Sequence, residues 1–253
     1  MHPLFDLTGR VAVITGGGTG VGRAMAEALT GAGASVVLVG RRQGLLQEAV
    51  RAIEANRSKA AAVSADLQDR AGLALVAKRV AEPFGAPDIL VNAAGVNLRE
   101  SVDEVSMQSW DLTLDLNLAV PFFFARELVS AMRTKGWGRV INIASLQSLR
   151  AFPDSLPYGA AKGGVLQLTR AMAQAWSPAG VTCNAIAPGF FPTALTAPVF
   201  DNPERAAWAA AQTAIGRNGR AEDLYGVTIF LAAPASDYIT GQVIFVDGGF
   251  TAR

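Results

Sequence analysis

Two hydrophobic patterns alternate along this chain. Short runs that are apolar at nearly every position are separated by longer segments in which apolar residues recur every three or four positions, as on one face of a helix. Predicted strands cover residues 10–15, 34–40, 59–64, 88–92, 139–144, 181–186 and 242–246. Predicted helices cover residues 20–31, 43–56, 69–82, 108–134, 155–176 and 221–232. Strands that are apolar throughout and alternate with helices indicate an α/β fold, with a parallel sheet covered on both faces.

Two segments depart from this regular alternation. Pro121 falls inside the long fourth helix, where a proline removes a backbone hydrogen bond, so we expect a kink there. Residues 188–203 are rich in proline and variable in character, and residues 188–214 are expected to form the loop over the substrate. The pattern contains no linker or repeat, so we expect a single domain spanning residues 1–253.

Composition narrows the classes of partner and compartment. The 253 residues carry a net charge of +1, and 17% of them are charged, which does not suggest nucleic-acid binding. No signal peptide is visible, and no apolar run approaches the roughly 18 residues of a membrane span. Cys183 and His2 are the only residues of their kinds, which excludes an internal disulfide, a histidine-based triad and a His/Cys metal site. We therefore expect a cytoplasmic protein that binds a small molecule, without a metal.

A glycine-rich segment joins the first predicted strand to the first helix. Glycines allow a sharp turn and a close approach of the backbone to a pyrophosphate, and the helix that follows offers free N–H groups to anionic oxygens. This strand–loop–helix context favours a dinucleotide site over an ordinary turn. Asn92, Ser145, Pro188 and Gly189 also follow strands, so they belong to the same edge of the sheet. The candidate phosphate-binding residues are Gly16, Gly18, Thr19, Gly20, Val21 and Gly22.

Tyr158 and Lys162 are four residues apart in a predicted helix and therefore share one face of it. A nearby ammonium favours the phenolate form and lowers the pKa of a tyrosine, which then exchanges protons with a carbonyl or an alcohol. Ser145, thirteen residues earlier, can hold the same substrate oxygen. Taken alone, the pair fits a surface helix that happens to carry a tyrosine and a lysine, and only the rest of the chain favours the proton-transfer interpretation.

Taken together, the motifs resemble those of the short-chain dehydrogenase/reductase family over essentially the whole chain. They are Thr15-Gly16-x-x-x-Gly20-x-Gly22, Asn92-Ala93-Ala94-Gly95, Ser145, Tyr158-x-x-x-Lys162, Pro188-Gly189 and Asp247-Gly248-Gly249. The resemblance implies a doubly wound, Rossmann-like parallel sheet of seven strands, a nicotinamide cofactor, and a homotetramer assembled through the helices that begin near Gln108 and Ser155. It also implies that Asn117 joins Ser145, Tyr158 and Lys162 as a catalytic residue by holding a relay water. The alternative for Asn117 is a structural polar residue that kinks its helix.

NADP(H) is expected more than NAD(H). The residues after the second strand are Arg41 and Arg42, which fit a 2′-phosphate, whereas an acidic residue there would favour NAD. Alternatively, the two arginines are solvent-exposed residues at the start of a helix. Asp66 could likewise cap the helix that begins near Asp69 instead of contacting the cofactor. The resemblance assigns the other cofactor contacts to Asp66, Leu67, Asn92, Ala93, Ala94, Gly95, Tyr158, Lys162, Pro188, Gly189, Phe191 and Thr193.

The sequence determines the substrate-binding residues less well than the cofactor-binding residues. Arg99 follows the Asn92–Gly95 motif, where it can reach a substrate carboxylate or pair with Glu100 or Asp103 at the surface. Other candidates are Ser145, Gln147, Phe191 and Trp208. Within the family, Arg99, residues 5–11, Ile215-Gly216-Arg217 and the C-terminal motif are similar to gluconate 5-dehydrogenase-like enzymes and their keto-deoxygluconate relatives.

The resemblance therefore implies an oxidoreductase that transfers hydride between the nicotinamide and a ketone or secondary alcohol. The expected substrate is a sugar acid or a polyol, such as 5-ketogluconate and gluconate. Several of the same features occur in 3-oxoacyl-[acyl-carrier-protein] reductases, which are the alternative enzyme class. A non-catalytic nucleotide-binding regulatory protein is a further alternative, against which the intact set of catalytic residues speaks.

Overall fold

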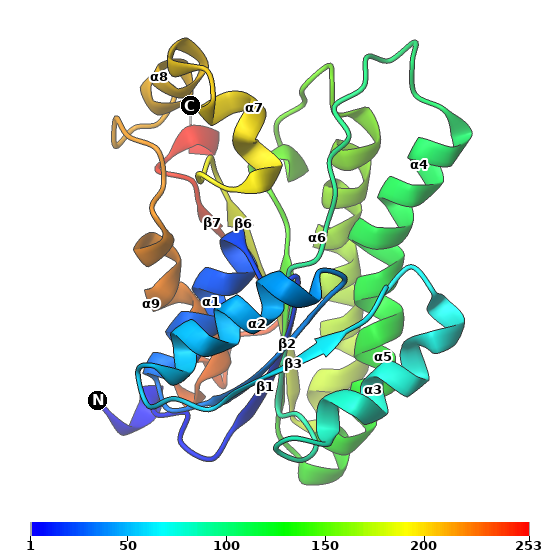
Figure 1. Ribbon diagram of the computed structural model, residues 1–253, viewed down its shortest axis with the longest axis vertical. Coiled ribbons are helices and arrows are strands. Elements are labelled where there is room, and N and C mark those ends of the chain that lie inside the picture. Colours follow the sequence, from blue (N-terminus) through cyan, green and yellow to red (C-terminus); the bar gives the residue numbers. More distant parts are fainter. Residues whose placement is uncertain (1, 253) are drawn as a thin grey trace.

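The computed structural model describes residues 2–252, and its seven strands form one parallel sheet (Figure 1). The strands lie in the order β3-β2-β1-β4-β5-β6-β7, so the chain starts in the middle, winds outward to one edge and then returns to build the other half. This arrangement confirms the predicted doubly wound, Rossmann-like sheet. The strands are β1 (Val11–Thr15), β2 (Ser35–Gly40), β3 (Ala60–Ser64), β4 (Ile89–Asn92), β5 (Gly138–Ile143), β6 (Val181–Pro188) and β7 (Val243–Val246).

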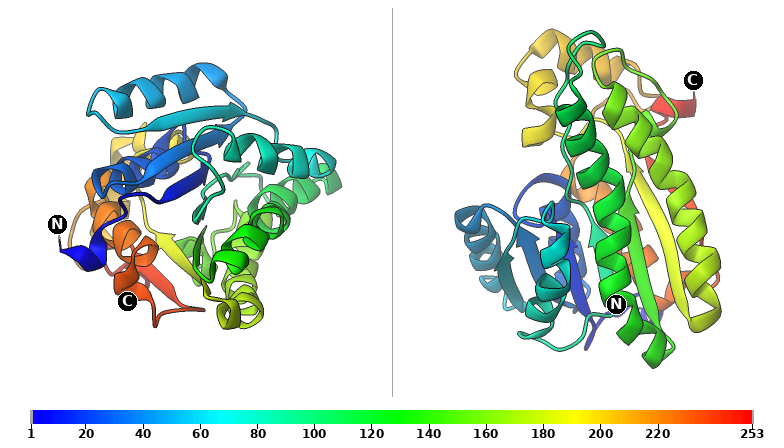
Figure 2. Two further views of the ribbon diagram at one scale, coloured as in Figure 1. Left: turned by 90° about the horizontal axis from the view of Figure 1, so that it is seen from below. Right: turned by 90° about the vertical axis from the view of Figure 1, so that its right-hand side faces the viewer.

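Helices cover both faces of the sheet, which Figures 1 and 2 show as two layers. Successive side chains of β1 point to opposite faces: Ala12 and Ile14 join one hydrophobic cluster and Val13 joins the other. One face packs against α1 (Gly20–Gly31), α2 (Gln43–Glu54) and α9 (Tyr225–Ala232). The other packs against α3 (Leu73–Ala81), α5 (Val120–Lys135) and α6 (Leu156–Trp176). Across residues 2–252, we find no helix with both the length and the apolar character to cross a membrane.

The long helix expected over residues 108–134 is interrupted before its proline. It consists of α4 (Met107–Leu114), a π-helical turn (Asp115–Ala119) and then α5. Pro121 has no N–H to donate to the carbonyl of Asn117, four residues back. At the junction, the N–H of Val120 donates to the carbonyl of Asp115, five residues back, which is the hydrogen bond of a π turn. The predicted disturbance is therefore real, and it places Asn117 within the irregular turn.

A second difference lies in the proline-rich segment, where no helix was predicted. This segment contains the short α7 (Ala197–Phe200) and is followed by α8 (Pro203–Ala211), which stand above the carboxyl ends of the strands (Figure 1). The side chain of Asn202 accepts hydrogen bonds from the N–H groups of Glu204 and Arg205, which caps α8. An asparagine cap, a proline in the first turn and a run of alanines are ordinary helix signals, so the prediction of an irregular loop was wrong here.

Candidate active site

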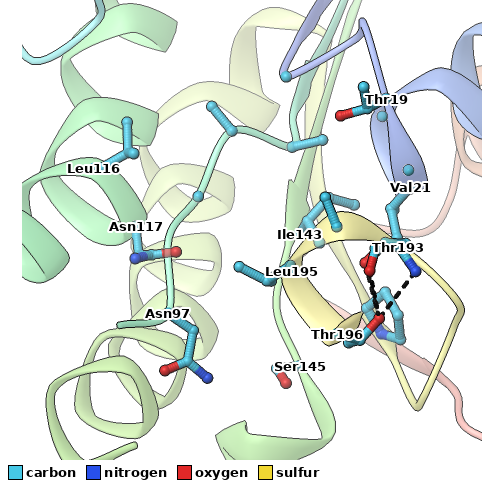
Figure 3. A pocket seen from close by; sticks show the side chains of 18 of the residues that line it. Thr19, Val21, Asn97, Leu116, Asn117, Ile143, Ser145, Thr193, Leu195 and Thr196 are labelled. Carbon is cyan, nitrogen blue, oxygen red and sulfur yellow. Dashed lines mark hydrogen bonds between the residues drawn. The ribbon is translucent and has the colours of Figure 1, made fainter. Parts of the chain in front are cut away.

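The loops that follow six of the strands surround one cavity of about 460 Å³ at the carboxyl edge of the sheet (Figure 3). Thr19 and Val21 from the start of α1 and Thr193 from the segment after β6 stand at one side, and Asn117 stands at the other. Most of the predicted cofactor residues line this cavity: Gly16, Gly18, Thr19, Gly20, Val21, Gly22, Arg41, Arg42, Asp66, Leu67, Ala93, Ala94, Gly95, Tyr158, Lys162, Pro188, Gly189, Phe191 and Thr193.

The backbone of the glycine-rich loop after β1 packs closely against the backbone of Ala93 and against other residues of the same loop. A Cβ on Gly16 would lie 2.9 Å from the carbonyl oxygen of Ala93, and a Cβ on Gly22 would lie 2.5 Å from that of Gly16. No side chain among the described residues caps α1 at Thr19, so the first N–H groups of this helix stay available to a ligand in the cavity. The positions of Gly16 and Gly22 leave no room for a side chain, and the helix behind them has free N–H groups. Both features fit the pyrophosphate of a dinucleotide.

Arg41 and Arg42 lie at the end of β2, where both line the cavity and remain exposed to solvent. Asp66 also lines it and accepts a hydrogen bond from the N–H of Gln68. The side chain that caps the following turn is that of Asp69, which accepts from the N–H of Gly72. The alternative interpretation, in which Asp66 caps the following helix, is therefore wrong.

Ser145, Tyr158 and Lys162 meet at the bottom of the cavity, each less than a tenth exposed. Ser145 follows β5, and the other two lie one turn apart on the same face of α6. The hydroxyl of Tyr158 lies near Ser145, whose side chain lowers the pKa of the phenol in part. The Nζ atom of Lys162 lies 5.6 Å from the centre of the Tyr158 ring and donates to the carbonyl of Ile143 at 2.7 Å. The three side chains thus form one connected group, as their spacing predicted.

The ionisation of this group differs from the sequence prediction. Burial raises the pKa of Tyr158, and a hydrogen bond to Ser145 and the charge of Arg99 lower it in part. Burial also lowers the pKa of Lys162 to about 8. The sequence predicts that Lys162 is the group that lowers the pKa of Tyr158. Instead, burial destabilises the ammonium itself, and the charge that lowers the pKa of the phenol in part is that of Arg99.

Asn117 lies at the same end of the cavity, fully buried in the π turn. Its Nδ2 donates to the carbonyls of Val96 at 2.8 Å and Thr113 at 2.9 Å. Its Oδ1 has no hydrogen-bond partner within residues 2–252 and points towards Gly95, where an added Cβ would lie 2.6 Å away. That Cβ position is also 3.8 Å from the Nζ of Lys162. The amide nitrogen therefore has a structural function, while the oxygen remains available beside the lysine.

Two predicted site residues lie outside the cavity wall. Asn92 is the last residue of β4 and is buried beneath it, where its Nδ2 donates to Asn142 Oδ1 at 2.9 Å and to the Pro121 carbonyl at 3.2 Å. Trp208 lies on α8, half exposed, with its ring edge-on to Phe190 and Phe250. Asn92 therefore joins two strands to α5 beneath the cavity. Trp208 packs against Phe190 and Phe250 in the segment above the cavity.

Arg99 lines the cavity near Tyr158, and Gln147 lines it as well, as predicted. The Nη1 atom of Arg99 lies 3.7 Å from Oδ2 of Asp154, so its partner is neither Glu100 nor Asp103. Its Nε is buried and has no partner within the described chain. Arg99 also adopts a left-handed backbone conformation, with φ of +54°. A partly buried cation with an unused donor, next to the phenol, provides a place for an anionic part of a substrate.

Asn97 lines the same wall (Figure 3) and was not singled out from the sequence. Its Nδ2 donates to the hydroxyl of Ser155 at 3.1 Å, and its Oδ1 accepts from the N–H of Arg99 at 3.3 Å. The only available signal was a polar residue two positions after the Asn-Ala-Ala-Gly motif. Its partner comes from a loop almost sixty residues later in the chain, which the local sequence cannot show.

Known proteins resemble this chain over almost its full length. A family model described as Enoyl-(Acyl carrier protein) reductase matches residues 16–251. Gluconate 5-dehydrogenase of Gluconobacter oxydans is 37% identical over 251 residues, which cover 99% of this chain and 98% of that protein. The 2-dehydro-3-deoxy-D-gluconate 5-dehydrogenase of Dickeya dadantii is 38% identical, with 98% of both chains covered. The crystal structure of a gluconate 5-dehydrogenase from Burkholderia cenocepacia, in complex with NADP and tartrate, is 36% identical and superposes with a TM-score of 0.94, covering 99% of this chain and 98% of that one.

Proposed function

Because the chain belongs to the short-chain dehydrogenase/reductase family, we propose that it is an NADP(H)-dependent dehydrogenase of a sugar acid. The reaction interconverts a secondary alcohol and a ketone, as between gluconate and 5-ketogluconate. Relatives named for gluconate and 2-dehydro-3-deoxy-D-gluconate support this substrate class.

The observation that carries the substrate assignment is the guanidinium of Arg99. It lines the cavity together with Ser145 and Tyr158, and its charge offsets a part of the rise that burial causes in the pKa of Tyr158. The arginine fork matches a carboxylate with two parallel hydrogen bonds, and its buried Nε lacks a partner among the described residues. A sugar acid offers a carboxylate to Arg99 and a hydroxyl to Tyr158, whereas an uncharged polyol leaves the arginine unsatisfied.

The residues at the cavity floor have distinct roles in this chemistry. A bound nicotinamide supplies or accepts the hydride. Ser145 holds the substrate oxygen by a hydrogen bond, and Tyr158 donates a proton to that oxygen during reduction or removes one during oxidation. Lys162 has its Nζ 5.6 Å from the centre of the Tyr158 ring, and below its pKa of about 8 it carries a charge that favours the phenolate as this forms. Asn117 presents its unpartnered Oδ1 on the side of Lys162, where a water can hydrogen-bond.

NADP(H) is the proposed cofactor in preference to NAD(H), because Arg41 and Arg42 line the cavity at the end of β2. The Burkholderia cenocepacia relative was crystallised with NADP, which supports this choice. Replacing both arginines by alanine is expected to raise KM for NADP⁺ by about 10- to 100-fold, since a hydrogen bond to a charged group contributes about 1.5–3 kcal/mol. KM for NAD⁺ should change much less. An equal change for both cofactors contradicts the assignment.

The substrate class is tested by turnover over a matched panel. Oxidation of D-gluconate and related sugar acids with NADP⁺ is compared with oxidation of sorbitol, and reduction of a 3-oxoacyl thioester is followed with NADPH. We expect kcat/KM to be highest for a sugar acid. Highest turnover of the thioester selects the 3-oxoacyl-[acyl-carrier-protein] reductase alternative. Nucleotide binding without turnover of any carbonyl or alcohol selects the regulatory alternative.

A homotetramer and a cytoplasmic location complete the proposal. The helices that we expect at the interfaces are α4 with α5 and α6, and the side chains of Met107 and Trp110 on α4 are 86% and 38% exposed. Apolar side chains so exposed on one helix suit an interface between subunits. Sedimentation velocity tests the assembly. The location rests on the single cysteine, Cys183, which is buried as a free thiol.

A further inference from the structure

Four residues form a closed ring of polar contacts between two loops beside the cavity. Asn97 donates to the hydroxyl of Ser155, and that hydroxyl donates to Oδ1 of Asp154 at 3.2 Å. The other carboxylate oxygen of Asp154 lies 3.7 Å from Nη1 of Arg99. The backbone N–H of Arg99 returns to Oδ1 of Asn97 at 3.3 Å. The ring joins the loop after β4 to the segment immediately before α6, the helix that carries Tyr158.

The contacts of this ring differ in how far they are exposed to water and in their length. Ser155 is 2% exposed and Asn97 is partly buried, so the link between them is protected from water. The carboxylate of Asp154 is 50% exposed, and its distance from Arg99 exceeds that of a hydrogen bond. A solvent-exposed ion pair of this kind contributes little to stability. The contact between Arg99 and Asp154 is therefore the one that exchanges most readily.

The state of Arg99 favours such an exchange. Its side chain is 19% exposed, its Nε is buried without a partner in the described chain, and its backbone is held in a left-handed conformation. A residue other than glycine keeps this conformation only where its surroundings enforce it, which here includes the hydrogen bond to Asn97. The backbone of Arg99 is thus fixed, while its guanidinium has a weak anionic partner on the solvent side and an unused donor.

We propose that Asp154 is a specificity-determining residue that occupies Arg99 in the free site and is exchanged for the carboxylate of the substrate. This inference rests on the proposed function. On exchange, Asp154 keeps its hydrogen bond from Ser155 and its access to water, while Arg99 gains a bidentate partner in the cavity. The negative charge of Asp154 competes with the substrate, so it sets how strongly the site favours anions over neutral polyols.

The test compares Asp154→Asn with Asp103→Asn. The control removes the same charge from an exposed position on the loop that carries Arg99. Asp154→Asn should lower KM for D-gluconate about two- to fivefold, the range that corresponds to an exposed ion pair. The kcat value should stay within about twofold, and the KM or inhibition constant of sorbitol should not fall. The gain should shrink in 0.5 M NaCl, because salt screens exposed charges. Asp154→Glu should restore the wild-type values, and Asp103→Asn should produce none of these changes.

Binding of tartrate to the NADP-loaded protein, measured by calorimetry, tests the exchange separately from catalysis. Asp154→Asn should bind tartrate about two- to fivefold more tightly, and this gain should disappear in an Arg99→Met background. Equal tartrate affinity in both proteins, a gain that persists without Arg99, or an equal fall of KM for sorbitol overturns the role of Asp154. A higher KM for gluconate in Asp154→Asn also overturns it, because Asp154 would then support Arg99 instead of competing for it. Failure of the wild type to oxidise any sugar acid refutes the proposed substrate and leaves the tartrate result to decide the exchange.

Discussion

Tyr158 and Lys162 are both more than nine-tenths buried, and burial drives each of them towards its neutral form. For the phenol this raises the pKa, and for the ammonium it lowers the pKa to about 8. The electrostatic cost of burial therefore falls on the lysine, because the phenol is uncharged at neutral pH.

The lysine makes this cost measurable in stability. Below pH 8, Lys162 is charged in both the folded and the unfolded chain, so the full cost of burying the charge is present. Between pH 8 and its ordinary value of 10.5, the folded chain has released the proton that the unfolded chain still holds, so stability rises with pH. The difference in melting temperature between the wild type and Lys162→Met should therefore shift in favour of the wild type across this window.

The control for this measurement is Lys78→Met, which alters an exposed lysine of α3. Its melting temperature should run parallel to that of the wild type between pH 7 and 10.5. Parallel curves for Lys162→Met as well would contradict the assigned pKa of Lys162.

For single residues, the sequence predicts which side chains form the site better than it predicts the surroundings of those side chains. The spacing of Ser145, Tyr158 and Lys162 was sufficient to bring them together. The direction of the Tyr158 pKa was not predictable, because it depends on burial and on Arg99, which approaches from another loop. Asn92 shows the same limit: it ends its strand at the expected edge, but its side chain points to Asn142 beneath the cavity.

Among the secondary-structure elements, the loop after β4 and the π turn are fitted closely to each other. A Cβ on Gly95 would lie 2.6 Å from Oδ1 of Asn117, which must then move. Because a misplacement of about 1 Å near the chemistry can cost about 100-fold in rate, Gly95→Ala should lower kcat by about 10- to 100-fold. Steady-state kinetics with a sugar acid, together with a melting curve to confirm folding, measures this effect.

Gly44→Ala is the matched control, since Gly44 lies within α2 and a Cβ there meets no atom of the described chain within 4 Å. This substitution should leave kcat unchanged and raise stability slightly, because alanine favours a helix over glycine. Equal kcat values for Gly95→Ala and the wild type would show that the position of Asn117 is not critical.

The elements also show what a periodic pattern misses. The Rossmann core was predictable because its strands are apolar throughout and its helices are amphipathic. The π turn depends on Pro121 and on the bond between Val120 and Asp115, which a simple helical period does not contain. α8 was predictable in principle from Asn202 and Pro203, but the prolines of the surrounding segment suggested an irregular loop instead.

In the whole molecule, the candidate active site and an ionic cluster around the buried carboxylate of Asp88 lie at opposite ends of the sheet. Asp88 precedes β4 at the amino end and is 4% exposed. It binds Lys135 at 2.8 Å, lies 3.7 Å from Arg10 and accepts from the N–H of Val11 at 3.0 Å. Asp88→Ala should lower the free energy of unfolding by about 1–3 kcal/mol, because it leaves a buried donor unpaired. Urea unfolding measures this loss.

The kcat value of the remaining folded Asp88→Ala protein should match that of the wild type, because the cavity lies at the carboxyl edge. Glu54→Ala, at an exposed position in α2, serves as the control and should change neither quantity. A large fall in kcat of the folded Asp88→Ala protein would contradict the separation of the two ends.

The account as a whole depends on proton transfer by Tyr158 inside a nucleotide cavity, and Tyr158→Phe tests this most directly. The substitution keeps the ring and removes only the hydroxyl, so folding and NADPH binding should persist while kcat falls by about 100- to 10,000-fold. Single-turnover kinetics with a sugar acid, alongside fluorescence titration of NADPH, gives both quantities on one sample. A variant that binds NADPH and retains a kcat within tenfold of the wild type would contradict the central role of the phenol.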